Sequence, residues 1–449
     1  MKRQSFWALL ANGLFFFVLS NPVYAAGFES QSLSTSGLGT ANASASVFGY
    51  DASNQFANPA TLADIKKATI TFGGQVIMPD IEFTNDGSQY ATGQPIEGEG
   101  GADLSSLYLV PSLYMATPIS ESLAYGISFN TPFASRTSYD NSWVGRFHST
   151  DSKITAYNIN PALAVKVLDS LNLGFGFSLQ YADASLTSAF NSYLACISTL
   201  VDLGSAYSDA VAACAPVAGE EGEQKLTGDS WSAGWNIGAT FQPLQSLRLA
   251  VDYRSAVFHD LEGKVEFSDT SGDNPLVATG AFINAPAQLD LDLPESFSIA
   301  LMLSLSQSVD LMVDYSWMGW SSIERFVIQY DSNQRDTVLP QNWKDTYRIA
   351  AGLEYQVTPK ARFRFGMAFD ESPITEDQYR SPRVPDSDRT WLSFGMNYLA
   401  FENVDLDFGY TYIQSASAKT ENVSPTQEVL IGKFDSSAHL LGAQLNWRF

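Results

Sequence analysis

Apolar and polar residues alternate strictly over much of the chain. In the last nine residues, 441–449, the odd positions are apolar or aromatic and the even positions are polar or glycine. The same alternation recurs at 171–181, 247–254 and 404–412. Successive side chains of a β-strand point to opposite faces, so each segment predicts a strand with one apolar and one polar face. Because the polar faces carry charges such as Arg362 and Asp405, they favour a water-facing lumen over the dry core of a soluble sandwich.

The pattern predicts an all-β fold, a 14-stranded antiparallel transmembrane β-barrel that occupies residues 68–449. The count is even, as is usual for single-chain bacterial barrels, and the final aromatic, Phe449, suits a closing strand. Short turns and long polar segments alternate between the strands, which places both chain ends in the periplasm and the long loops outside. The predicted strands are 68–83, 103–117, 121–131, 152–167, 171–186, 228–242, 246–267, 289–305, 309–330, 342–357, 361–370, 389–399, 403–415 and 437–449.

Two segments precede the first predicted strand. Residues 1–25 have the charged start, the apolar stretch and the small-residue end of a signal peptide, so we expect the mature chain to begin at Ala26. Residues 26–67 are rich in glycine, serine and alanine and have no strong period. A disordered leader is one interpretation of this segment. We favour a hatch, or plug, inside the lumen, because its apolar residues are too frequent for a solvated tail and fourteen strands enclose a wide bore.

Charge and cysteine content narrow the classes of protein further. The formal net charge is −23, which argues against a nucleic-acid partner. Cys196 and Cys214 are the only cysteines, and an exported protein with two cysteines is expected to pair them. An unbroken helix between them would hold the sulfurs about 27 Å apart, whereas a disulfide needs Cα atoms within about 7 Å. We therefore predict a break near Gly204 that folds two short helices into a hairpin; two free buried thiols are the alternative.

Several motifs occur in an order that resembles the outer-membrane long-chain fatty-acid transporter (FadL) family. The resemblance covers the whole mature chain, and its motifs are Ala26-Gly27-Phe28, Ser36-Gly37-Leu38-Gly39, Asn58-Pro59-Ala60, Gly234-Trp235-Asn236-Ile237-Gly238, Asp252-Tyr253-Arg254-Ser255, Trp320-Ser321-Ser322, Trp343-Lys344-Asp345-Thr346-Tyr347-Arg348 and Phe369-Asp370-Glu371-Ser372-Pro373. Asn-Pro-Ala alone is common, so the order of the motifs carries the signal.

The resemblance implies a monomeric barrel that takes up a hydrophobic ligand passively. In this family the ligand enters at a groove between outer loops and passes to an inner site. Movement of the extreme N-terminus, here around Phe28, then opens a path beside the plug tripeptide Asn58-Pro59-Ala60. A kink in the third strand gives a lateral exit. Gly126 is our candidate for this kink, because a glycine permits a bend inside a strand.

The head group of a fatty acid needs a cation or converging donors, because burying an unpaired carboxylate is costly. Arg254 and Arg348 have inward parity, and Arg146 and His148 lie at the top of a long loop. Each of these four is a candidate partner for the carboxylate. The alternative is that they pair with wall carboxylates such as Asp252 or Glu354.

An apolar path is also required, because burying each CH₂ is worth about 0.8 kcal/mol and an acyl chain will not follow a wet pore. Leu200 and Leu203, in the predicted helical hairpin, are candidates for the external groove. They could equally serve only to hold the loop together.

Enzymatic chemistry is not expected. The three histidines have no metal-ligand spacing, and none has a recognisable catalytic partner. No cofactor or metal site is predicted. The expected partners are a long-chain fatty acid or another hydrophobic small molecule, outer-membrane lipid and lipopolysaccharide, and the barrel-assembly machinery, with the protein a monomer of the bacterial outer membrane. Uptake of neutral aromatic or aliphatic hydrocarbons is an alternative, as is a general porin.

Overall fold

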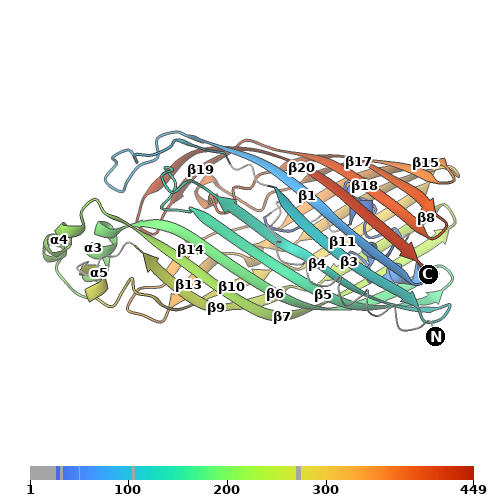
Figure 1. Cartoon of the computed structure of the whole chain (residues 1–449), viewed down its shortest axis with the longest axis horizontal. Coiled ribbons are helices and arrows are strands. Elements are labelled where there is room, and N and C mark those ends of the chain that lie inside the picture. The colour runs from blue at the N-terminus through green and yellow to red at the C-terminus, as the bar shows by residue number, and fades with distance from the viewer. Residues whose placement is uncertain (1–26, 31–33, 50, 104–106, 269–274) are drawn as a thin grey trace, which may run out of the picture.

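The computed structural model describes residues 27–30, 34–49, 51–103, 107–268 and 275–449. Its β-segments form fourteen antiparallel strands of one closed barrel (Figure 1). The barrel closes where β1 (Thr69–Asn85) pairs along its whole length with β20 (Val429–Arg448). The predicted fourteen-stranded barrel is confirmed. The predicted signal peptide, 1–25, and the expected mature start, Ala26, lie outside the described residues.

Each of the remaining strands pairs with its neighbours in chain order. Six strands are interrupted and carry two labels, namely β2 with β3, β8 with β9, β10 with β11, β12 with β13, β14 with β15 and β18 with β19. The bounds are β2 Gly101–Asp103, β3 Tyr108–Pro118, β4 Leu123–Ser138, β5 Asp151–Leu168, β6 Leu171–Asn191, β7 Glu221–Leu244, β8 Leu247–Arg254, β9 Val257–Ser268, β10 Ala285–Leu293, β11 Ser296–Ser304, β12 Val309–Met318, β13 Arg325–Tyr330, β14 Thr337–Pro340, β15 Thr346–Thr358, β16 Ala361–Asp370, β17 Arg389–Phe401, β18 Val404–Ser415 and β19 Ala418–Val423. Among the described residues, no helix is long and apolar enough to cross a membrane.

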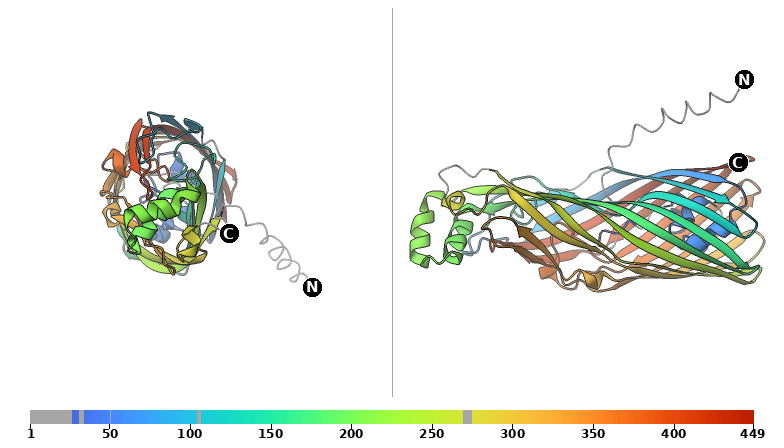
Figure 2. Two further views of the ribbon diagram at one scale, coloured as in Figure 1. Left: turned by 90° about the vertical axis from the view of Figure 1, so that its left-hand side faces the viewer. Right: turned by 90° about the horizontal axis from the view of Figure 1, so that it is seen from below.

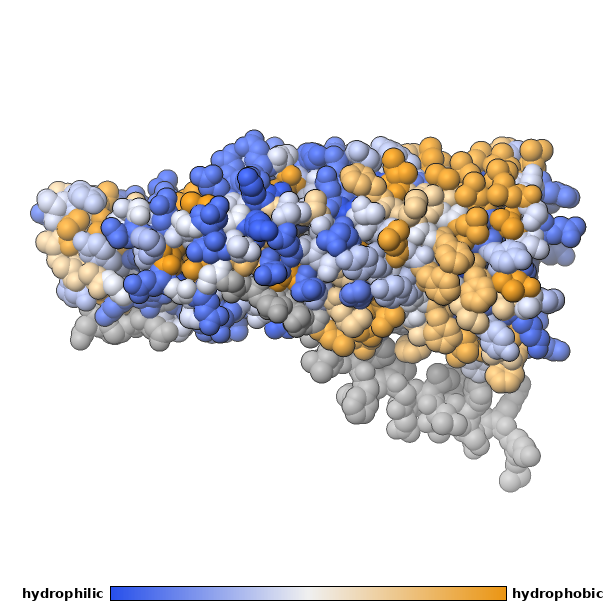
Figure 3. All heavy atoms as spheres, turned by 90° about the horizontal axis from the view of Figure 1, so that it is seen from above, coloured by the Kyte–Doolittle hydropathy of each residue, from blue (hydrophilic) through white to orange (hydrophobic). Residues whose placement is uncertain are grey.

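The two faces of the strands follow the alternation in the sequence. On β20 the apolar Leu441 and Trp447 are 48% and 40% exposed on the outside, whereas the polar Gln444 and Asn446 are buried on the lumen side. Figure 3 shows that apolar side chains gather over the half of the barrel that carries the C-terminus, and that the half toward helices α3 to α5 is mostly hydrophilic. This apolar band is the surface that faces lipid.

Several strands extend further toward the long loops than the sequence pattern predicts. β20 begins at Val429 instead of 437, β7 begins at Glu221 instead of 228, and β4 ends at Ser138 instead of 131. Above the lipid band the outer face meets water, so it no longer needs apolar residues. The alternation that marks a strand is lost there, although the strand continues.

Residues 34–49 and 51–64 lie inside the barrel, in the half that carries the apolar band (Figure 2). They form three short helical turns, α2 (Thr35–Leu38), η1 (Ala52–Gln55) and η2 (Pro59–Asp64). Each turn begins with a side-chain cap, from Ser34, Asp51 and Asn58 respectively. These turns are almost fully buried, as expected for a hatch packed against the wall.

Glycines in the wall let the hatch backbone approach closely. A Cβ on Gly366 of β16 would lie 2.1 Å from the carbonyl carbon of Thr40, and one on Gly174 of β6 would lie 2.2 Å from the amide nitrogen of Ala60. Neither contact is possible for a residue with a side chain. These glycines lie on the lumen face of their strands and form part of the surface on which the hatch rests, here called the hatch seat.

A helical hairpin covers part of the opposite end of the barrel (Figure 2, left). It consists of α3 (Ser192–Asp202) and α4 (Tyr207–Cys214), with η3 (Ala215–Val217) after them and α5 (Pro275–Ala278) beside α3. Gly204, between the two helices, has a φ of 96°, so the predicted break is confirmed. A disulfide joins Cys196 to Cys214, whose Cα atoms are 5.8 Å apart.

Candidate functional site

The described N-terminal segment, residues 27–30, pairs with the third strand of the barrel. The amide of Ser30 donates to the carbonyl of Pro132 at 2.7 Å, and the amide of Ala134 donates to the carbonyl of Phe28 at 2.8 Å. β3 pairs with β4 only as far as Leu113 opposite Phe129. The N-terminal segment therefore bonds to β4 beyond the point where β3 leaves it. We call this unpaired stretch between β3 and β4 the seam.

The prediction that β4 bends at Gly126 is wrong, because the strand is irregular elsewhere. Gly126 lies in regular register opposite Ala116 of β3 and Ala162 of β5. The register with β5 instead shifts between Asn130 and Phe133, a stretch that contains Pro132, a residue that cannot donate to a ladder. Gly126 accommodates the hatch, since a Cβ there would lie 2.1 Å from Oε1 of Gln55.

Three aromatic rings surround Phe28 of the N-terminal segment. Phe28, which is fully buried, lies 5.0 Å from Trp320, 5.9 Å from Trp343 and 6.0 Å from Phe133, measured between ring centroids. Trp320 belongs to η4 (Trp320–Ser322). We call these four residues the aromatic cluster. The aromatic cluster belongs to the same hydrophobic core as the walls of a cavity toward the long loops. Trp320 also lines a second cavity, next to the hatch.

The cavity toward the long loops, here called the outer cavity, has a volume of about 60 Å³ and largely apolar walls. Its apolar lining includes Ile154, Leu186, Leu261, Leu289, Leu291 and Phe326, which come from strands β5, β6, β9, β10 and β13. Its polar lining includes His148, Arg383 and Asn422 from three different loops or strand ends. An apolar cavity with a few converging polar groups is the usual form of a binding site for a small amphiphile.

Arg383 is the cation of the outer cavity. Its guanidinium donates to Oγ of Ser149 and to the carbonyl of Thr187, both at the long distance of 3.5 Å. No carboxylate of the described residues lies within ion-pair distance of it. Burial among apolar groups lowers the pKa of Arg383 to about 10, which leaves it charged at neutral pH. The outer cavity thus presents one positive charge with weak protein partners.

His148 lies beside Arg383 in the same cavity. Its Nε2 bonds to the carbonyl of Asn422 at 2.9 Å, and its Nδ1 has no hydrogen-bond partner among the described residues. Burial, with a smaller contribution from the Arg383 charge, lowers the pKa of His148 to about 4. The ring is neutral at pH 7, so Arg383 alone supplies charge to a ligand there. His148, a candidate site residue in the sequence, therefore lines the outer cavity.

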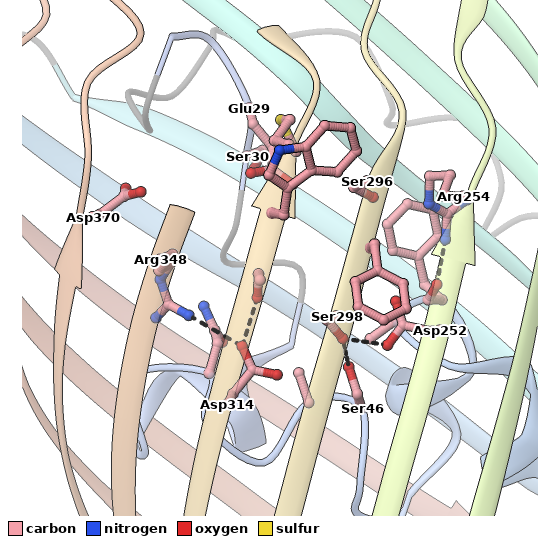
Figure 4. A pocket seen from close by; sticks show the side chains of 18 of the residues that line it. Glu29, Ser30, Ser46, Asp252, Arg254, Ser296, Ser298, Asp314, Arg348 and Asp370 are labelled. Carbon is pink, nitrogen blue, oxygen red and sulfur yellow. Dashed lines mark hydrogen bonds and ion pairs between the residues drawn. The ribbon is translucent and has the colours of Figure 1, made fainter. Parts of the chain in front are cut away.

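The second cavity, here called the inner cavity, lies between the hatch and strands β8, β11, β12 and β15 and has a volume of about 140 Å³ (Figure 4). Its lining mixes apolar side chains, such as Phe56 and Phe297, with charged ones, and it carries more acids than bases. The charged residues in it are Glu29, Asp252, Arg254, Asp314, Arg348 and Asp370. The excess of acids disfavours a fatty-acid carboxylate in this cavity, because another buried negative charge would have no free cation among the described lining residues to pair with.

Arg254 and Arg348, both predicted as head-group partners, contact the hatch in this cavity. Arg254 donates to the carbonyl of Phe56 and stacks over its ring at 3.8 Å. Arg348 donates to the carbonyl of Ala41 and lies 4.0 Å from Asp314. The structure gives both side chains a role in holding the hatch against the wall.

The other predicted site residues fall into separate places. Arg146 forms a two-bond pair with Glu221, at 2.7 and 2.8 Å, and is not among the residues that line the outer cavity. Leu200 packs against the hydrophobic core, whereas Leu203 is 56% exposed at the end of α3. The structure therefore does not bring the predicted set together in one site.

The tripeptide Asn58-Pro59-Ala60 anchors the hatch. The Oδ1 of Asn58 accepts the amide of Ala60 at 3.0 Å and so caps η2, which Pro59 begins. Its Nδ2 donates to the carbonyls of Ala239 and Val251 in the wall, at 3.2 and 3.3 Å. These contacts explain why asparagine and proline stand at these two positions: one caps the turn and binds the wall, and the other begins the turn.

Arg383 is the principal residue that the sequence pattern did not indicate. It lies in the polar segment 371–388, where alternation is absent. A basic residue between two prolines, Pro382 and Pro385, in a chain of net charge −23 is the only signal that pointed to it. Its hydrogen-bond partners Ser149 and Thr187 lie 234 and 196 positions away in the sequence.

Comparison with known proteins identifies the family. A family model described as outer membrane protein transport protein (OMPP1/FadL/TodX) matches residues 16–449. The chain belongs to this family. The predicted resemblance to the FadL family is confirmed, and the localisation in the outer membrane follows from the fold and from the relatives.

Relatives with this fold differ in the ligands that their names state. The long-chain fatty acid transport protein of Escherichia coli K12 is 26% identical over 462 residues and covers 100% of both chains. A putative outer membrane protein of Neisseria meningitidis is 27% identical over 448 residues, or 95% of each chain.

A crystal structure of a Pseudomonas aeruginosa FadL homologue has a TM-score of 0.82 at 24% identity and covers 94% of this chain and 100% of that chain. The Pseudomonas putida toluene transporter TodX has a TM-score of 0.67 at 16% identity and covers 89% of this chain and 94% of that chain. The chain is thus a FadL/TodX-family transporter of hydrophobic compounds.

Proposed function

We propose that this protein takes up long-chain fatty acids passively across the outer membrane. The single observation that carries the proposal is Arg383, a half-buried guanidinium with only long hydrogen bonds, set in a largely apolar cavity. A carboxylate at this position would satisfy the guanidinium, and the apolar walls would hold the start of the acyl chain. A sixteen-carbon tail prefers such walls to water by more than about 10 kcal/mol.

The path begins at the outer end of the barrel. The helical hairpin presents exposed Val201, Leu203 and Tyr207 there, and we propose that they form a first, weak contact for the ligand. From this contact the ligand passes to the outer cavity, which the aromatic cluster closes on its inner side. Displacement of Phe28 together with residues 27–30 is the proposed gate, because two backbone hydrogen bonds and ring contacts hold this segment.

A lateral exit is favoured over an axial one. The axial route runs through the acidic inner cavity and then the buried hatch. The seam lies beside the N-terminal segment instead, and lipid-facing apolar residues flank it, including Leu109 and Ile127, which are 48% and 41% exposed. We propose that the acyl chain leaves through the seam into the membrane. The protein acts as a monomer with no enzymatic step, and the barrel-assembly machinery and lipopolysaccharide are its partners in the membrane.

A competition experiment tests the proposed ligand. Purified protein is loaded with a fluorescent fatty acid, and oleate or toluene is added as competitor. Oleate is expected to displace the probe at far lower concentration. The second candidate function, uptake of neutral hydrocarbons, rests on the largely apolar lining of the outer cavity, and equal displacement by toluene would favour it.

A further inference from the structure

Five buried amides line the lumen beside the seam. Asn130 of β4, Asn158 and Asn160 of β5, Gln180 of β6 and Asn236 of β7 each have at most 1% of their surface exposed. The register places Asn130 opposite Asn158 and Asn158 opposite Gln180, so the side chains lie on adjacent strands. We call these residues the amide belt.

The belt begins where the wall pairing ends. Phe129 is the last residue of β4 that pairs with β3, and Asn130 is the next residue. Two positions further, the carbonyl of Pro132 accepts the amide of Ser30 from the N-terminal segment. A movement of that segment would therefore expose the belt and the seam together.

Hydrogen bonds within the belt satisfy only part of its polar atoms. Asn158 donates to Asn130 at 3.2 Å, and Asn160 donates to Asn236 at 2.9 Å. Nδ2 of Asn236 and both polar atoms of the Gln180 amide have no hydrogen-bond partner among the described residues, whereas the side chain of Asn130 bonds to Tyr114. Buried amide groups are rarely left unpaired, so each such atom needs an explanation. Several unpaired polar atoms lie together beside the seam, and this arrangement indicates a ligand that has polar atoms.

The chemistry of the belt matches a carboxyl group in transit. Amide N–H groups donate to a carboxylate, but they carry no net charge and so bind it less strongly than a guanidinium does. A site of this kind can receive the head group from Arg383 and still release it. We propose that the amide belt binds the carboxyl group of the fatty acid at the seam while the acyl chain enters the membrane. This inference rests on the proposed function.

The test compares oleate with its methyl ester, which has the same chain and no acid. The variant carries Asn158→Leu, which removes an amide that donates to Asn130, and Gln180→Met, which removes two unpaired polar atoms; both changes retain most of the volume. Uptake of radiolabelled oleate into proteoliposomes is expected to fall about tenfold, and uptake of methyl oleate is expected to stay unchanged. The affinity of the outer cavity for oleate, measured by probe displacement, is also expected to stay unchanged.

A matched control and a second variant keep the inference falsifiable. Asn172→Leu removes a buried amide of the same strand as Gln180, one that bonds to Asp64 and Thr240, and it is expected to leave the ratio of oleate to ester uptake unchanged. Asn130→Asp places a carboxylate at the seam and is expected to slow oleate alone. If the variants slow oleate and the ester equally, or slow neither, the belt holds only water or serves only the fold, and the inference is wrong. If the unaltered protein transports no oleate, the proposed function itself fails.

Discussion

Replacement of Arg383 by methionine removes the charge of the outer cavity and keeps much of the side-chain volume. The guanidinium has only 3.5 Å hydrogen bonds to Ser149 and Thr187. The fall of its pKa from 12.5 to about 10 corresponds to about 3 kcal/mol of unfavourable burial. A bound carboxylate would offset this cost through charge-assisted hydrogen bonds worth about 2 kcal/mol. The Kd for oleate is therefore expected to rise about thirtyfold in Arg383→Met.

Displacement of a fluorescent fatty acid from the purified protein measures this change, with methyl oleate as the second competitor. The Kd for the ester is expected to stay the same or to fall, because the variant cavity no longer contains an unpaired charge. Arg335→Met is the matched control, since that side chain is 83% exposed and lies 3.7 Å from Asp202 in a surface ion pair. An oleate Kd within twofold of the unaltered protein, or an equal loss for oleate and the ester, would refute the assignment of Arg383 as the head-group partner.

Three further predictions concern the gate, the hatch seat and the outer cavity. Phe28→Ala removes the central ring of the aromatic cluster, so single-channel conductance in a planar bilayer is expected to rise; an unchanged trace would show that other contacts close the path. Gly366→Ala places a Cβ 2.1 Å from Thr40 and is expected to destabilise the hatch by about 1–3 kcal/mol, which a lower thermal midpoint would show. The control is Gly74→Ala, whose Cβ would meet nothing closer than 3.5 Å, and it is expected to leave the midpoint unchanged. The pKa of His148 is lowered on folding to about 4, so stability is expected to fall as the pH drops from about 6.5 to 4, by about 3 kcal/mol in total; in His148→Gln the thermal midpoint should vary less over this range.

The local pattern of residues was sufficient to predict the barrel. Side chains alternate along a strand with a period of two, independently of the rest of the chain. Segments such as 441–449 and 404–412 therefore indicate both the strand conformation and the apolar and polar surroundings on its two faces. The break at Gly204 was also a local matter, because two cysteines eighteen positions apart cannot meet across a straight helix. Strand ends above the lipid were missed, because water on both faces of the wall removes the pattern that marks a strand.

The glycine positions were visible in the sequence, but their meaning was not. Gly366 and Gly174 occupy the polar phase of strongly alternating strands, which pointed to a lumen face. Only the structure shows that Thr40 and Ala60 of the hatch lie against them. A similar ambiguity led to Gly126 as the site of the strand bend, whereas the register shift lies at Asn130–Phe133.

The sequence alone determined the strands, their two faces and the existence of a plug-like segment, because these depend on neighbours along the chain. The tertiary structure alone decided which charges face which cavity. Arg254 and Arg348 have the parity of head-group partners, yet the hatch takes their hydrogen bonds. Arg383 has no pattern around it, yet the closed barrel places it next to His148 among apolar side chains. The physical reason is that a binding cavity is formed by residues far apart in sequence, and their distances are fixed only when the barrel closes and the hatch is seated.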